Sequence, residues 1–168
     1  PYAYTNGATA TVTADAITGA GDATLFSSVN SSGVLFAEIS ALANDGTFRI
    51  LNFKKDADNY VRLYYRSDAN QITARVRVGG VDRLLYNYVL TDATVMRKFA
   101  IRWKEDDFSL WSGGTKITES LSGGIFSAGD LLDLSFTDGV TSHFYGKTRQ
   151  VAVSNYLTDA QMQNLTSP

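Results

Sequence analysis

Cysteine is absent from the 168-residue chain, and its only two prolines, Pro1 and Pro168, are the terminal residues. Without cysteine the protein has no disulfide scaffold, no cysteine-ligated zinc site and no thiol chemistry. The one histidine, His143, excludes a metal site built from several histidines and would have to serve alone in any Ser-His-Asp arrangement. No apolar run approaches the roughly 20 residues of a membrane-spanning helix, so we expect no membrane insertion.

Acidic and basic residues nearly balance over the whole chain, but they are separated along it. The formal net charge of −2 offers no general reason to bind nucleic acid. Residues 49–104 contain 12 of the 15 basic residues and 5 of the 17 acidic ones, a net charge of +7, and the remainder carries −9. A hydrophobic content of 44% excludes a disordered chain, and the length suits one domain with a substantial core. Since the chain does not begin with methionine, we expect a processed product or an excised domain.

A period of two dominates the hydrophobic pattern. Phe99, Ile101 and Trp103 alternate with charged or small residues, and the runs at 59–66 and 71–78 alternate in the same way. Such alternation is typical of strands that bury one face, and clusters of Gly, Asp and Asn mark tight turns between the runs. We predict strands near 8–13, 34–42, 47–54, 59–66, 71–78, 81–88, 97–104, 107–112, 115–120, 131–137 and 143–154.

Many short strands with almost no helix predict an all-β fold, a two-sheet antiparallel sandwich. One short helix is expected at the C-terminal end, where Thr158 can cap residues 159–165 and Gln161 occupies the capping-box position. Residues 1–32 are interpreted as an irregular N-terminal segment that includes the first strand. Residues 33–168 form the body of the same domain.

Four stretches occur in an order that resembles a known family. They are residues 33–47, 59–67 together with 71–80, 98–111 and 144–162. This order resembles the concanavalin A-like jelly rolls of the laminin-G and pentraxin-like kind, in particular those of tail-fibre and other virion structural proteins of bacteriophages. The resemblance implies a jelly-roll sandwich of the lectin/glucanase type with a short C-terminal helix. The last stretch is the most specific, because a closing strand that contains Gly146 and Lys147 runs into a Leu-Thr-Asp-Ala helix start at residues 157–160. Gly146 permits close backbone approach in such a closing strand.

The same resemblance implies a function. It implies a non-catalytic module of a phage tail or virion that binds a bacterial surface polysaccharide or lipopolysaccharide and acts outside the cell. A purely structural module stays open as the alternative, one that decorates the virion or joins other virion subunits, often as a homotrimer. A polysaccharide-degrading enzyme is the third hypothesis. It is disfavoured because the three glutamates, Glu38, Glu105 and Glu119, do not form the paired carboxylates that glycoside hydrolysis needs.

The polar face of the basic segment is the candidate binding surface. If the strands at 59–66 and 71–78 pair, their tyrosines and arginines point to one side. Arginine binds carboxylate, sulfate or phosphate through planar bidentate contacts, and a tyrosine ring can stack on a sugar. An ordinary solvent-exposed face and a subunit interface remain alternatives. The proposed ligand-binding residues are Tyr60, Arg62, Tyr64, Arg66, Arg75, Arg77 and Arg102, with Arg102 and Lys104 extending the face across the same sheet, and Trp111 as an exposed platform.

Two further groups of side chains are given simpler interpretations. The acidic turns offer oxygen ligands for Ca²⁺ at residues 56–58, 105–107, 130–133 and 138. Their spacing does not match an EF-hand loop, and aspartate in turns mostly caps backbone groups. We therefore predict no metal site and no cofactor, with calcium as the one ion to consider. The remaining large aromatics are expected to fill the core: Phe48, Phe53, Phe99, Trp103, Phe108 and Phe136.

Overall fold

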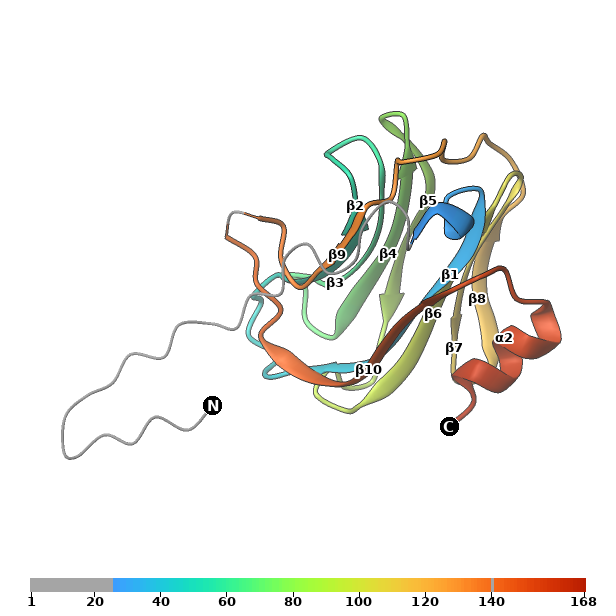
Figure 1. The fold of residues 1–168 in the computed structure, drawn as a ribbon. Helices are drawn as coiled ribbons and strands as arrows, with labels where there is room; N and C mark the ends of the chain where they lie inside the picture. Colours follow the sequence, from blue (N-terminus) through green and yellow to red (C-terminus); the bar gives the residue numbers. More distant parts are fainter. Residues whose placement is uncertain (1–25, 140) are drawn as a thin grey trace.

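Two five-stranded antiparallel sheets pack face to face in the computed structural model, which describes residues 26–139 and 141–168 (Figure 1). One sheet, named here the β3 sheet, has the strand order β5-β4-β3-β2-β9, and the other, the β6 sheet, has the order β10-β1-β6-β7-β8. The predicted jelly-roll sandwich with a short C-terminal helix is confirmed. The predicted strand at 8–13 lies outside the described residues. The elements are η1 (Ser27–Val29), β1 (Ser32–Ala41), β2 (Arg49–Lys54), β3 (Tyr60–Tyr65), β4 (Gln71–Val78), β5 (Val81–Val89), β6 (Arg97–Lys104), β7 (Asp107–Ser112), β8 (Thr115–Ser120), β9 (Asp133–Ser135), β10 (Gly146–Ser154) and α2 (Asp159–Thr166).

The core lies between the sheets and is built from the apolar half of each alternating strand. Phe53, Phe99, Trp103 and Phe108 are fully buried there, as predicted. The Trp103 indole donates a hydrogen bond to the carbonyl oxygen of Val29 at 2.8 Å, so its one polar atom is satisfied inside the sandwich. Burial of each such side chain stabilises the folded state by about 1.5–3 kcal/mol. The apolar face of each strand therefore points into the core, and the polar face points to solvent.

Helix α2 covers part of the outer face of the β6 sheet (Figure 1). Thr158 caps it in the predicted capping box: the backbone N–H of Gln161 donates to the Thr158 hydroxyl, and the Thr158 N–H donates to the Gln161 side chain at 2.8 Å. Met162 is completely buried against strands β1, β6 and β7. No helix among the described residues is long and apolar enough to cross a membrane. The outer face of the β3 sheet carries no such helix within the described chain.

The closing strand β10 pairs with β1, and Gly146 lies opposite Ala41. A β-carbon at Gly146 would collide with the carbonyl oxygen of Ser40 and with the Phe144 ring. The close backbone approach predicted for Gly146 is therefore present. It brings the last strand against the first strand of the described fold.

Candidate functional site

The outer face of the β3 sheet gathers the tyrosines and arginines of the basic segment. Strands β3 and β4 pair in antiparallel register, with Arg62 opposite Arg75 and Tyr64 opposite Thr73. Directly opposed residues share one face of a sheet, so the predicted juxtaposition of these side chains is present. We call this surface the aromatic–basic face; it comprises Phe48, Tyr60, Arg62, Tyr64, Arg75 and Arg77.

Arg62 is the central cation of this face. Its Nε donates to the Asn52 side-chain oxygen at 2.8 Å, and its guanidinium carbon lies 4.3 Å from the centre of the Tyr60 ring. Burial lowers the pKa of Arg62, and the neighbouring charge of Arg75 acts in the same direction. Within residues 26–139 and 141–168, the terminal amino groups of Arg62 have no hydrogen-bond partner. Two preoriented donors are therefore left for a ligand.

The other arginines of this region are held by their own neighbours. Arg75 makes a bidentate contact with Asp82 at 2.9 and 2.8 Å, and this hydrogen bonding raises the pKa of Arg75. Arg77 lies 3.7 Å from the same carboxylate. Arg66 binds the Asp68 carboxylate at 2.9 Å. These three cations contribute positive potential. The donors of Arg75 and Arg66 are largely used within the protein, whereas among the described residues Arg77 makes only the 3.7 Å ion pair and its buried Nε has no hydrogen-bond partner.

Phe48 belongs to this face and not to the core, so its predicted placement is wrong. It is 40% exposed, and its ring stacks on Tyr64 with the centroids 6.2 Å apart. Phe48 has the same phase as Ile50 and Asn52, which point outward from β2, and that phase was the available signal in the sequence. Tyr60, a predicted ligand-binding residue, is buried. It is only 3% exposed because Arg62 and Arg75 lie over its ring. Tyr60 therefore supports the arginines instead of offering a free ring.

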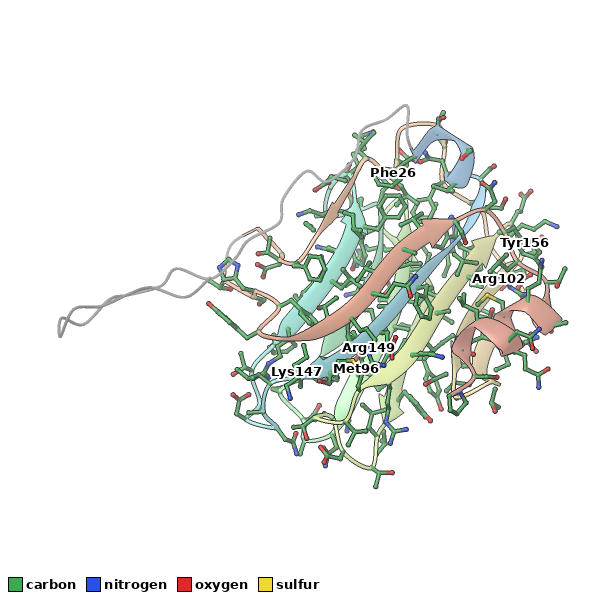
Figure 2. All side chains as sticks on the ribbon, turned by 60° about the horizontal axis from the view of Figure 1, so that its bottom comes forward. Phe26, Met96, Arg102, Lys147, Arg149 and Tyr156 are labelled. Carbon is green, nitrogen blue, oxygen red and sulfur yellow. The ribbon has the colours of Figure 1, made fainter. Side chains whose placement is uncertain are left out.

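Arg102 does not extend the aromatic–basic face, because β6 belongs to the other sheet; this prediction and that for Lys104 are wrong. Arg102 is 2% exposed and lies beneath α2, next to Tyr156 (Figure 2). Its terminal nitrogens bind Asp159 at 2.6 Å and Asp107 at 3.0 Å. Arg102 therefore anchors the helix.

Trp111 is not an exposed platform either. It is 5% exposed and packs under Met162 of α2, and its indole N–H donates to the Ser109 hydroxyl at 3.0 Å. The phase of Trp111 correctly places it on the outer face of its strand. That face is covered, because the apolar side of the C-terminal helix needs an apolar surface to pack against.

The acidic turns mostly bind their own backbone. Asp56 accepts the N–H groups of Asp58 and Asn59, and Asp138 accepts those of Thr141 and Ser142. In the part of the chain that the structure describes, no group of three or more Asp, Glu or His residues could hold a metal ion. The prediction of no cofactor, with calcium as the one ion to consider, stays a prediction.

No family model and no protein with a curated description matches the chain. Solved structures match its fold. Domain 4 of AbnA, an extracellular arabinanase from Geobacillus stearothermophilus in complex with arabinotriose, has a TM-score of 0.65 at 11% identity, over 88% of this chain and 70% of that one. The CBM40 of Ruminococcus gnavus IT-sialidase bound to α2,3-sialyllactose has a TM-score of 0.61 at 11% identity, over 82% and 83%. CBM66 from Bacillus subtilis has a TM-score of 0.53 at 14% identity, over 74% and 76%. At such identities the likeness shows a shared fold.

Proposed function

We propose that this chain is a non-catalytic carbohydrate-binding module that holds an anionic glycan against its aromatic–basic face. The observation that carries the proposal is that a guanidinium with available donors and a pair of stacked aromatic rings lie on one sheet face. Arg62, whose terminal amino groups have no hydrogen-bond partner among the described residues, lies on the same sheet face as the stacked rings of Phe48 and Tyr64. Glycan-bound complexes among the structures that share the fold, with sialyllactose and with arabinotriose, support carbohydrate as the ligand class.

The chemistry of the face selects among glycans. A sugar ring presents an apolar C–H surface, which packs on the exposed face of Phe48. A carboxylate, sulfate or phosphate on the same or the next sugar accepts two hydrogen bonds from Arg62. Because Arg62 is half-buried, this charged contact is less screened by salt than one at a fully exposed arginine. We therefore expect uronic, sulfated or phosphorylated sugars to bind better than neutral ones.

The proposal extends to the setting in which the module works. We place it in the tail or surface of a bacteriophage virion, outside the cell, with a bacterial polysaccharide or lipopolysaccharide as its target. The support is the resemblance of residues 33–47, 59–67 with 71–80, 98–111 and 144–162 to such virion modules. Mass spectrometry of purified virions tests this setting separately from glycan binding, because a glycan-binding module absent from virions would contradict only the setting.

Titration calorimetry with a panel of neutral and anionic oligosaccharides tests the binding face. The Arg62→Gln variant should weaken binding of the anionic members about tenfold or more, since a hydrogen bond to a charged group contributes about 1.5–3 kcal/mol. Phe48→Ala should weaken neutral and anionic members alike. Lys147→Gln is the matched control, because Lys147 is exposed on β10 of the other sheet.

Two outcomes would contradict the proposal. One is that the parent binds no member of the panel, with calcium or with a chelator present. The other is that Arg62→Gln and Phe48→Ala both bind like the parent. Release of shortened or unsaturated sugars from a polysaccharide would overturn the non-catalytic assignment.

A further inference from the structure

Strand β5 forms one edge of the β3 sheet, and its second half is unusually apolar for an exposed edge. It pairs with β4 and with no other strand of the described chain. Leu85 is 54% exposed, Tyr86 38% and Val89 67%. The segment 85–89 contains no charge, proline or glycine. An exposed edge of this kind presents unpaired backbone N–H and C=O groups beside apolar side chains, which is a template for another strand.

The other sheet edges within residues 26–139 and 141–168 carry the features that prevent such pairing. Strand β9 has only three residues. Strand β8 carries Lys116 and Glu119, and the exposed part of β10 carries Lys147 and Arg149. Short strands and charged side chains are the usual protection of an edge. Strand β5 has a bulge near Arg83, but the bulge lies before residues 85–89 and leaves them regular.

The segment 85–89 is complementary to itself. In an antiparallel pair centred on Asn87, Leu85 lies opposite Val89 of a second copy, Tyr86 lies opposite Tyr88, and Asn87 lies opposite Asn87. The two side chains of each opposed pair then point to the same face of the joined sheet. This pairing is symmetric about a two-fold axis perpendicular to the sheet. Apolar and aromatic residues meet one another, and no like charges are opposed.

Asn87 fits the position on the axis. Its side-chain oxygen accepts hydrogen bonds from the Thr73 hydroxyl at 2.8 Å and from Arg66 at 3.1 Å. These contacts fix the amide plane, and its Nδ2 has no partner in the part of the chain that the structure describes. The amide is therefore oriented before any second strand arrives.

We propose that a second copy of this chain docks on β5, so that two β3 sheets join through residues 85–89 into one continuous ten-stranded sheet. The occupant is a second copy because the edge is complementary to itself in a register that a two-fold axis permits. The two aromatic–basic faces then lie on the same side of one sheet. The proposal does not depend on what those faces bind.

Sedimentation velocity over a range of protein concentrations tests the pairing. The parent should show a dimer at high concentration that dissociates on dilution. Leu85→Lys and Val89→Glu, each alone, should weaken association at least tenfold, because each opposes a charge to an apolar side chain of the partner. Leu42→Lys is the matched control: Leu42 is 62% exposed but lies outside β5, so association should not change.

The double variant Leu85→Lys/Val89→Glu tests the register itself. In the proposed pair, each lysine lies opposite a glutamate of the other copy, twice per dimer, so the dimer should return. Within one copy the two positions are about 13 Å apart along the strand, too far for direct contact.

A parent that is monomeric at all concentrations would overturn the proposal and leave the edge to a different chain. A dimer insensitive to both single variants, or a double variant that stays monomeric, would also overturn it. Urea unfolding of each variant confirms that it is folded.

Discussion

At the scale of single residues, Asp45 and Arg49 make the clearest prediction. Arg49 is 3% exposed and donates to both carboxylate oxygens of Asp45, at 2.8 and 2.9 Å. A hydrogen bond from the Thr47 N–H, and then the contact with Arg49, lower the pKa of Asp45 from 3.8 to about 2. A carboxyl whose pKa is lower in the folded state stabilises it above the unfolded pKa, and this stability is lost as the pH falls through the folded pKa.

The free energy of unfolding should therefore fall faster in the parent than in Asp45→Asn between about pH 4 and pH 2. Urea titrations at a series of pH values measure the gap between the two proteins. The gap should be constant above about pH 5 and close toward pH 2. A gap that does not change over this range would show that Asp45 gives no pH-dependent stability.

The residues of the candidate face show what the sequence can and cannot predict at this scale. Period-two alternation correctly places Arg62, Tyr64 and Arg75 on one side of two strands. It identifies a side of a strand but not what covers that side. The alternation therefore predicts the side of the strand on which Trp111 lies, but not how far it is exposed. Hydrophobicity predicts Phe48 in the core, although Phe48, just before β2, has the phase of the residues that point outward from that strand.

At the scale of elements, α2 depends on an ion pair that spans the sheet and the helix. Arg102 of β6 is held by Asp159 at the first residue of α2 and by Asp107 of β7. Burial lowers the pKa of Arg102, but the hydrogen bond that Arg102 donates to Asp159 and the charge of Asp107 outweigh it, so the pKa is raised and the pair stays ionised. The helix therefore docks through charge at its start and through Met162 in its middle.

Arg102→Ala should lower the free energy of unfolding by about 3 kcal/mol, because it leaves the partly buried carboxylate of Asp107 without its cation and with only the Tyr156 hydroxyl as a side-chain donor among the described residues. Amide exchange in α2 should accelerate before exchange in β6. Lys104→Ala, an exposed lysine on the same strand, should cost less than about 1 kcal/mol through its contact with the Tyr156 ring. Equal losses in the two variants would contradict an anchoring role for Arg102.

The sequence predicted the elements better than their partners. The strand at 97–104 and the capping box at Thr158 are both present as predicted. Local alternation and local hydrogen bonds determine such elements. Assignment of β6 to the second sheet depends on where the chain crosses after β5, and no local pattern encodes that crossing. For this reason Arg102 was placed on the wrong sheet.

At the scale of the whole molecule, the basic segment does not form one surface. Its strands β2 to β5 lie in the β3 sheet, and β6 lies in the β6 sheet. Part of its positive charge therefore serves as an anchor beneath α2, and part is paired with acidic residues outside the segment, Arg49 with Asp45 and Lys55 with Asp130. The net charge of +7 over residues 49–104 overstates the charge available to a ligand. The candidate anion site is therefore centred on the amino groups of Arg62 and does not extend over the whole basic segment.

The two proposals together predict a difference between soluble and immobilised glycan. Two faces on one continuous sheet can engage a dense polysaccharide at the same time, which raises apparent affinity without any new contact. Val89→Glu should leave calorimetric binding of a short soluble glycan unchanged and weaken binding to an immobilised polysaccharide by roughly a hundredfold. The Leu85→Lys/Val89→Glu double variant should recover the lost avidity together with the dimer. Loss of bivalency weakens binding to the immobilised glycan only. Equal weakening toward the soluble and the immobilised glycan would therefore show that Val89 acts within the binding face.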